Sequence, residues 1–508
     1  MKIFCTASHD AYITNKIINQ NLRVEDANVG RAGTLDLFRL YGETLFKGTG
    51  SQDEVSRILV KFDYGKLRSL TGSKADLNSD NFSAKLKLFD VRGGHPVPSN
   101  FTVIVHPLSQ SFDEGVGKDV SGFTDIGSTN FITASISNGV VSAWHRSGAN
   151  AEGLMGDSVD IIGSGNLGSG VEKLFSTQFF PEGTEDLVVD VTKVVSSTIA
   201  GQMKNHGFRI SFSGSDESDS KSRFIKRFAS RHVANPYIRP KIEVSFDDSI
   251  QDHRGNFLFD VSGSLFLQNY NRSSLANLVS GSTQISGDSC LKVKLKKGQY
   301  EFTSVASQHK AGTHNESVKG LYSASFGISS VENSKISRKK TLAQLISDEK
   351  SVEFTEFWYS NDGSVGFHTG SITISLSDRE DNLGLGNLEV YAINAKSSYS
   401  KEDEERIRIF AIDHDEEFSK PRKKAYSRKS KVFENVYYRV RDADSLKIIF
   451  DFDEEKKSTR ISTDSKGMFF DFHFDVLPHG RSYLFEYLIV NRGTRKIIRD
   501  KRTRFTIG

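Results

Sequence analysis

The chain has 508 residues, with 67 Lys and Arg against 64 Asp and Glu, and a formal net charge of +3. So balanced a charge argues against a protein that mainly contacts nucleic-acid phosphates. The length is too great for one core and predicts about three domains. The 37 Phe and 42 Gly, against 8 Pro, favour strands joined by turns.

The sequence begins with MKIFCTASHDAYITN, in which one basic residue precedes a short apolar stretch and Asp10 follows. We therefore expect neither a signal peptide nor insertion into a membrane. The two cysteines, Cys5 and Cys290, are too few for a disulfide framework or a cysteine-based zinc site. These features fit a protein that assembles in a reducing cytoplasm.

Apolar and polar residues alternate along most of the chain. Clear examples are SRILVKFDY (56–64), AKLKLFDV (84–91), FTVIVHPL (101–108), CLKVKLKK (290–297) and RSYLFEYLIVN (481–491). A period of two is typical of half-buried strands, so we predict an all-β fold of several β-sandwich domains.

Few helices are expected, and both are short. The segment DVTKVVSSTIAGQMKNHG (190–207) repeats apolar residues every fourth position, with Gly207 as its expected C-terminal cap. KKTLAQLISDEK (339–350) is the second, weaker candidate.

Changes in pattern divide the chain into residues 1–249, 250–398 and 399–508. The first division closes with the strand KIEVSFDDS, and the middle division is also rich in strands. The third is entered through KSSYSKEDEERIRIF (396–410), and its strand spacing fits one immunoglobulin-like sandwich. No repeat of fixed period occurs, which argues against a propeller or solenoid.

Several short segments of the first division occur in a characteristic order. HDAYITN carries Asp10, ANVGRAGTLDLFRL carries Asn28, Gly30 and Gly33, and SRILVKFDYGKL follows. VVDVTKVVSSTIAG, NHGFRISFSG and NPYIRPKIEVSF come later. In this order the division resembles a β-sandwich family named for its DNRLRE motif, although that string is absent. The resemblance implies a jelly-roll-like sandwich of a carbohydrate-binding or surface module, here with loop insertions around 112–180.

Two further regions are similar to segments of virion structural proteins of tailed bacteriophages. They are RHVANPYIRPKIEVSFDDS with NFLFDVSGSLFLQN (231–269), and STRISTDSKGMFFDFHFDVLPHGRSYLFEYLI (458–489). The resemblance implies a non-enzymatic component of a tail, baseplate, neck, fibre or capsid decoration, assembled in the host cytoplasm. Its expected partners are other virion proteins and copies of itself.

Candidate catalytic patterns are weak. Gly163, Gly165 and Gly168 match G-x-G-x-x-G, but the segment after them does not read as the helix that a dinucleotide site needs, so we predict a loop. The acidic pairs are Asp247/Asp248, Asp413/Asp415 and Asp451/Asp453. Glycoside hydrolysis needs two acids that face one cleft, and nothing in the sequence places the two acids of any pair in this way. A polysaccharide-degrading enzyme is therefore our third hypothesis, and we predict neither catalytic residues nor a cofactor.

Metal-ligand spacing is also missing. Asp216, Glu217 and Asp219 in SGSDESDSKS offer oxygen ligands for Ca²⁺ but lack the spacing of an EF-hand loop. His309 and His314 have no nearby cysteine or paired acid. We predict that SGSDESDSKS is a flexible acidic turn and that His309 and His314 lie in a solvated loop. We predict no metal site.

Three aromatic residues are candidates for contacts with a glycan. Trp144, Trp358 and Tyr359 could stack on sugar rings if they are exposed, although packing in a core is the commoner fate of such residues. A carbohydrate-binding adhesin or receptor-binding protein is therefore the second hypothesis.

Two basic regions are candidates for docking. The first, KPRKKAYSRKSK (420–431), and the second, near the end of the chain, contain Arg422, Lys423, Lys424, Arg428, Arg499 and Arg502. Acidic runs at 402–405 and 413–417 interrupt any continuous basic patch, so we do not expect nucleic acid as a partner. An acidic neighbouring protein fits this alternation, and an ordinary solvated surface fits it equally well.

Overall fold

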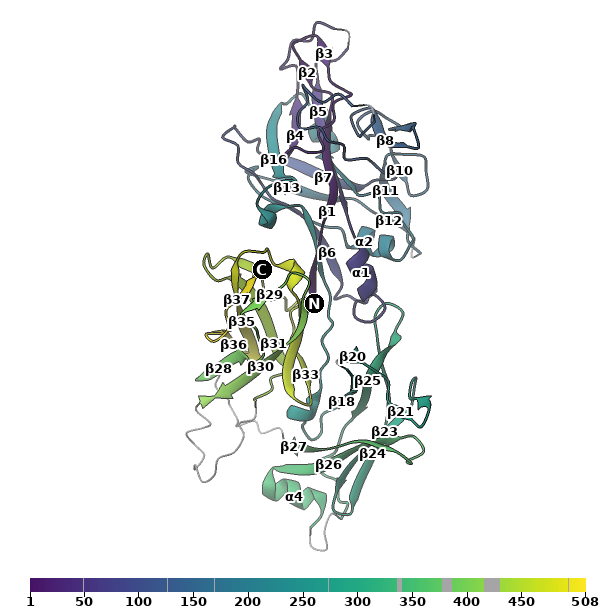
Figure 1. Cartoon of the computed structure of the whole chain (residues 1–508), viewed down its shortest axis with the longest axis vertical. Coiled ribbons are helices and arrows are strands. Elements are labelled where there is room, and N and C mark those ends of the chain that lie inside the picture. The colour runs from purple at the N-terminus through teal and green to yellow at the C-terminus, as the bar shows by residue number, and fades with distance from the viewer. Residues whose placement is uncertain are drawn as a thin grey trace. The chain divides into compact units, whose positions relative to one another are not determined.

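The computed structural model describes residues 1–48, 50–125, 127–168, 170–272, 274–335, 340–376, 386–414, 430–491 and 493–508. The chain forms two compact units. The N-terminal unit comprises Lys2–Ser69 and Phe82–Ser245, and the C-terminal unit comprises Met1, Leu70–Asn81 and Phe246–Gly508. Both units are built almost entirely from strands (Figure 1), which confirms the predicted all-β, multi-domain fold class.

The N-terminal unit contains the first seventeen named strands. They are β1 (Lys2–Thr14), β2 (Ile17–Ile18), β3 (Leu22–Arg23), β4 (Thr34–Leu40), β5 (Glu54–Phe62), β6 (Ser83–Leu88), β7 (Phe101–Pro107), β8 (Thr133–Ser137), β9 (Val140–Ala143), β10 (Glu152–Leu154), β11 (Ile161–Asn166), β12 (Val171–Lys173), β13 (Ser176–Phe180), β14 (Leu187–Asp190), β15 (Phe208–Phe212), β16 (Arg223–Ala229) and β17 (Lys241–Ser245). The short helices are α1 (Gly65–Leu70), α2 (Thr192–Ile199), α3 (Gly214–Ser218) and the 3-10 turn η1 (Pro236–Ile238).

Strand β1 belongs to two sheets. Its first half pairs with β17, with Lys2 opposite Ser245, and its second half pairs with β5, with Tyr12 opposite Ile58. The strand order is β13-β7-β15-β5-β1 on one side and β1-β17-β6-β14 on the other. The Gln178 side chain joins the two edges, because it donates to Asp186 O at 2.8 Å and accepts from Val188 N at 2.6 Å. The outer strands β13 and β14 therefore lie next to each other.

The insertion after β7 folds against the sheet that contains β5. Its buried residues include Leu108, Phe112 and Trp144, which pack with Ile13 of β1 and Leu59 of β5. The loop insertions expected around 112–180 thus share a small core with the sandwich, and apolar burial holds them on it.

Arginine side chains order the acidic segment around α3. Glu217 accepts from Arg57 Nε and Nη2 at 2.8 Å each, while Asp216 and Asp219 both accept from Arg223 at 2.7–2.9 Å. The expected flexible acidic turn is therefore wrong. Its carboxylates are held in ion pairs, and those of Asp219 and Arg223 are bidentate, a geometry that strengthens such pairs.

The C-terminal unit contains the remaining elements. They are η2 (His253–Gly255), β18 (Gly263–Gln268), β19 (Tyr270–Asn271), β20 (Ser274–Leu275), β21 (Val279–Ser280), β22 (Thr283–Gln284), β23 (Leu291–Lys297), β24 (Tyr300–Ala311), β25 (Glu316–Phe326), α4 (Leu342–Glu349), β26 (Ser351–Ser360), β27 (Gly366–Ser375), β28 (Leu388–Ala392), β29 (Ser398–Tyr399), β30 (Glu404–Asp413), β31 (Asn435–Asp442), β32 (Ile448–Phe450), β33 (Ser462–Asp464), β34 (Gly467–His473), η3 (Phe474–Val476), β35 (Ser482–Asn491), β36 (Thr494–Arg499) and β37 (Phe505–Ile507).

The first part of this unit is a six-stranded antiparallel sheet in the order β18-β25-β24-β23-β26-β27. Strand β24 bends between two partners, since Tyr300 to Ala306 pair with β23 and Ser307 to Ala311 pair with β25. Helix α4 contacts β26, and a capping box of Thr341 and Gln344 begins it. The short helix predicted over 339–350 is confirmed.

The last part consists of two sheets, β28-β30-β34-β33 and β29-β37-β35-β31-β32 with β36 beside β35. Aromatic side chains fill the space between them, for example Phe470, which stacks on Tyr438 at 4.2 Å and meets Phe485 edge-on at 5.3 Å. The Tyr483 hydroxyl donates to Pro478 O at 2.6 Å, as in the tyrosine corner of immunoglobulin-like sandwiches.

Two boundaries differ from those expected. Strand β28 pairs with β30, so the last sandwich begins before residue 399. Leu70–Asn81 interrupts the first division, and Thr313 N of the C-terminal unit donates to Thr71 O at 3.0 Å.

Helix α2 ends at Ile199, and Gly207 does not cap it. Gly207 instead has φ +94° and lies against β5, where a Cβ would meet Val60 O at 2.4 Å. Among the described residues, no helix has the length and apolar character needed to cross a bilayer.

Candidate functional site

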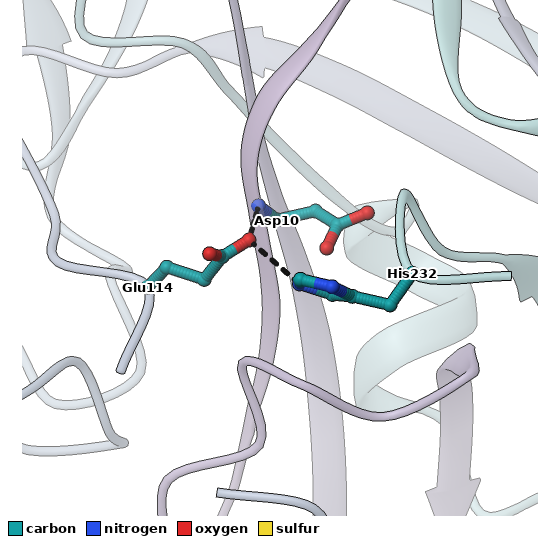
Figure 2. Close-up of side chains that lie close together, drawn as sticks. All are labelled: Asp10, Glu114 and His232. Carbon is teal, nitrogen blue, oxygen red and sulfur yellow. Dashed lines mark hydrogen bonds and ion pairs between the residues drawn. The ribbon is translucent and has the colours of Figure 1, made fainter. Parts of the chain in front are cut away.

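Three titratable side chains meet inside the N-terminal unit (Figure 2). Asp10 lies on β1, Glu114 lies in the loop between β7 and β8, and His232 follows β16. One carboxylate oxygen of each acid and one imidazole nitrogen lie within 4.8 Å of one another. In the part of the chain that the structure describes, no other group of three such residues comes as close.

Backbone packing fixes the loop that carries Glu114. Asn28 Nδ2 donates to Glu114 O at 2.9 Å, and Asn28 Oδ1 accepts from Gly117 N at 2.8 Å. Gly30 allows this close approach, because a Cβ there would lie 1.7 Å from Glu114 O. Asn28 and Gly30, which belong to the segment with the family resemblance, therefore position the loop.

The Glu114 carboxylate is the centre of a hydrogen-bond network. Its Oε1 accepts from Asp10 N at 3.0 Å and from Arg231 Nε at 2.6 Å. The same oxygen lies 3.2 Å from His232 Nε2, and Oε2 accepts from Arg231 Nη2 at 3.2 Å. The Glu114 side chain is 11% exposed and that of His232 is 26% exposed, so the cluster opens to solvent on the His232 side.

The Asp10 carboxyl is fully buried, and only one of its oxygens has a partner. Oδ2 accepts from Arg231 N at 2.5 Å, whereas Oδ1 has no hydrogen-bond partner. Burial raises the pKa of Asp10 to about 7; the hydrogen bond from Arg231 N lowers it, and the Glu114 charge raises it further. A buried oxygen without a partner is costly, which makes this carboxyl the most unusual group of the cluster.

Two carboxylates and one imidazole are ligands suited to a divalent cation. Sequence spacing could not reveal this set, because its members lie more than one hundred residues apart and come together only in the fold. Asp10 stood in a segment with the family resemblance, but no signal distinguished Glu114 or His232 from other surface residues.

The aromatic residues predicted to contact a glycan do not form a platform. Trp144 is 5% exposed and donates from Nε1 to Asn130 O at 2.9 Å, and Trp358 is fully buried with its Nε1 donating to Glu356. Only Tyr359 is partly exposed, and it lies in the other unit from Trp144. Both indoles therefore fill cores, and neither tryptophan meets the condition of exposure set for a glycan contact.

The predicted docking residues fall into two groups. Arg422, Lys423, Lys424 and Arg428 lie outside the described residues. Arg499 and Arg502 have side chains about half exposed, and each pairs with a carboxylate of the chain, Arg499 with Glu486 at 2.9 Å and Arg502 with Glu389 at 2.7 Å.

The loop predicted for the glycine-rich segment is wrong at its first two glycines, which lie in a strand. Gly163 and Gly165 lie in β11, which pairs with β10 and β12, and the strand β12 follows where a dinucleotide site would need a helix.

A second polar site is a pocket of the C-terminal unit, with a volume of about 280 Å³. Its charged lining includes Lys74, Asp248, Arg406 and Asp471. Arg406 Nε donates to Asp471 at 2.8 Å, Lys74 lies 3.6 Å from the same carboxylate, and Asp248 accepts from the amino group of Met1 at 2.6 Å. Asp247 also lines the pocket, and its Oδ1 accepts from Ser249 N at 2.9 Å and from Ser249 Oγ at 2.7 Å.

Fold and site together define an all-β protein of several sandwich-like domains, with a partly buried cluster of two acids and a histidine among the residues that the structure describes. No protein-family model matches the chain, and no curated protein matches it. Among solved structures, a titin fragment shares 9% identity over 52% of this chain and 97% of its own, with a TM-score of 0.15.

Two further solved structures are similar over most of the chain. A DUF4785 family protein from Legionella pneumophila shares 9% identity over 99% of this chain and 92% of its own, with a TM-score of 0.14. An ICAM-5 D1–D4 ectodomain fragment shares 10% identity over 98% and 100%, with a TM-score of 0.13. At these scores none of the three assigns the chain to a family.

Proposed function

We propose that the chain is a non-enzymatic structural and docking component of a tailed-phage virion. One observation carries the docking part of this proposal, namely a hairpin of exposed apolar side chains. The virion part rests on the resemblance of residues 231–269 and 458–489 to phage structural proteins.

The hairpin is formed by β8 and β9 and turns at Asn138 and Gly139, both of which have positive φ. Such a turn matches the twist of a two-residue hairpin. On its strands Ile136 lies opposite Val141, with 38% and 47% of their surfaces exposed, and Val140 at the turn is 70% exposed. An isolated hairpin is marginal in water, so apolar residues gathered on one favour a partner surface.

A second copy of the chain is the partner that this hairpin fits best. Within the described ranges β8 and β9 pair only with each other in a sheet. Asp113 bonds the outer edge of β8, through Ala134 O at 3.2 Å and Ile136 N at 2.6 Å, so β9 offers the edge for a second copy. Edge strands are templates for pairing with another chain, and virion proteins occur in symmetric sets of copies. Weak contacts repeated around a symmetry axis add up to a stable particle.

The deciding experiment is quantitative mass spectrometry of purified phage particles from the source, with the copy number set against that of the major capsid protein. We expect a fixed stoichiometry of several copies per particle. Absence of the chain from purified particles overturns the virion proposal and directs attention to glycan binding, the property expected of an adhesin.

The docking surface has its own test, the mass of the purified chain by light scattering as a function of concentration. We expect the double variant Val140→Ser/Val141→Ser to associate at least tenfold more weakly than the wild type. Val331→Ser is the matched control, since this valine is 74% exposed but lies outside the hairpin. Equal association of all three proteins removes the hairpin as the contact.

A further inference from the structure

We propose that Asp10, Glu114 and His232 form a binding site for a divalent transition-metal ion of the Zn²⁺ class. The site goes beyond the proposed function and does not depend on it. It is carried by the position of the three ligand atoms and by a buried oxygen that lacks a partner.

Asp10 Oδ1 is the first part of the argument. Asp10 is fully buried in the sandwich, and its second oxygen has no hydrogen-bond partner in the described chain. Buried carboxylate oxygens are almost always paired with a donor or a cation. In Figure 2 the Asp10 carboxyl and the His232 ring lie side by side. A cation held between them gives Oδ1 a partner that the protein itself does not provide.

The distances are the second part. Glu114 Oε1 and His232 Nε2 are 3.2 Å apart. Two ligands of a tetrahedral Zn²⁺ at bond lengths of about 2.1 Å lie roughly 3.4 Å apart. The distance between Glu114 Oε1 and His232 Nε2 is therefore close to the one expected when both bind the same Zn²⁺. One Asp10 oxygen lies within 4.8 Å of a ligand atom of each of the other two residues, so an inward shift of at most about 1.4 Å completes a three-residue face.

The kind of ion follows from the ligand types. One imidazole nitrogen and two carboxylate oxygens match Zn²⁺, which commonly uses three protein ligands and one water. Ca²⁺ prefers six to eight oxygen ligands and is poorly served by a set that includes an imidazole. The partial exposure of His232 leaves a side from which the ion can enter and a water can bind.

Arg231 is the competing cation. Its Nε donates to Glu114 Oε1 at 2.6 Å and its Nη2 to Oε2 at 3.2 Å, so the guanidinium partly neutralises the acid without a metal. It does not reach Asp10 with its side chain; only its backbone N–H does. When an ion takes Oε1, the guanidinium can keep its bond to Oε2, so the two cations share the carboxylate.

Binding would join three segments that are distant in sequence, namely β1, the loop after β7 and the turn after β16. A structural ion stabilises the folded state because the unfolded chain does not present its ligands together. The expected role is therefore to fasten the inserted loop to the sandwich.

The test is a calorimetric titration of the metal-free full chain with Zn²⁺. We expect one ion per N-terminal unit, and at least tenfold weaker binding after His232→Gln. His145→Gln is the matched control, because His145 Nδ1 lies 3.3 Å from Asp160 Oδ1 as a histidine–acid pair outside the cluster. Either no saturable binding, or equal weakening by both variants, overturns the site and leaves an ion-pair network.

Co²⁺ provides a second measurement on the unaltered protein. We expect the strong visible absorption of a tetrahedral Co²⁺ complex in the wild type, its displacement by Zn²⁺, and its loss in Glu114→Gln. The weak absorption of an octahedral aqueous-type complex in the wild type contradicts the proposed ligand set. Particle mass spectrometry is unaffected by either result, so a failure of the metal site and a failure of the virion proposal are distinguishable.

Discussion

Replacing Asp10 by Asn should change how the stability of the N-terminal unit depends on pH. In the folded state the pKa of Asp10 is about 7, against 3.8 for an exposed carboxyl. Between these values the folded chain holds a proton that the unfolded chain has released. The free energy of unfolding therefore falls as pH rises through this window, and above pH 7 the loss is complete.

The magnitude follows from the width of the window. At about 1.4 kcal/mol per pH unit, the ionisation of Asp10 costs the wild type roughly 2–3 kcal/mol between pH 5 and pH 8. Asp10→Asn has no such loss, because its carbonyl oxygen still accepts from Arg231 N and no charge is buried. Relative to the wild type, the variant should therefore gain about 2–3 kcal/mol over this range. Any fixed cost of burying the new amide leaves this difference unchanged.

The unfolding of the N-terminal unit can be followed separately, because each unit contains one tryptophan. Trp144 lies in the N-terminal unit and Trp358 in the C-terminal unit, and the chain has no others. In a Trp358→Phe background, urea unfolding followed by Trp144 fluorescence reports the N-terminal unit, with EDTA present to remove bound cations. The free energy of unfolding is measured for Trp358→Phe and for Trp358→Phe/Asp10→Asn at pH 5 and at pH 8. The difference between the two proteins should change by about 2–3 kcal/mol between these pH values, and a change below about 0.5 kcal/mol refutes the reasoning.

Three further predictions concern packing. Arg254→Leu should destabilise the C-terminal unit by about 3–5 kcal/mol, because it strips two buried carboxylates, Glu356 and Asp252, of ion pairs at 2.6 and 2.5 Å. The double variant with Glu356→Leu should recover only part of this, since Asp252 stays unpaired, and no recovery in urea unfolding contradicts the pairing of Arg254 with Glu356. Gly30→Ala should cost about 2 kcal/mol or more in thermal unfolding, whereas Gly33→Ala, with nothing within 4 Å of its Cβ, should cost little. Acrylamide should quench Trp144 weakly, since its indole is 5% exposed, and strong quenching would restore it as a glycan contact.

Local patterns predicted the elements well where one face of a strand is buried. LKVKLKK became β23 with strictly alternating exposure at its start, and the apolar spacing within 339–350 became α4. Gly207 misled, because a glycine in the left-handed region serves a close approach between strands as readily as a helix end.

The candidate site was beyond the reach of sequence patterns. Asp10, Glu114 and His232 each have ordinary local surroundings in the sequence. Only the folded chain brings the loop after β7 and the turn after β16 to Asp10. Trp144 misled in the opposite direction. Its neighbours in SAWHRSG are polar, but a small core formed by the inserted loop covers the ring. The missed cluster and the choice of Trp144 as a glycan contact both depend on contacts between residues far apart in the sequence, and periodicity does not encode such contacts.

The shared strand β1 also has a consequence for how the protein is made. Its first half is completed by β17, whose residue Ser245 leaves the ribosome more than two hundred residues after its partner Lys2. During synthesis the first half of β1 must therefore wait with this edge unpaired until β17 has emerged, a topology that slows folding and exposes the chain to misassembly. A nascent chain stalled before Ser245 should remain a chaperone client, and one stalled well beyond it should release the chaperone.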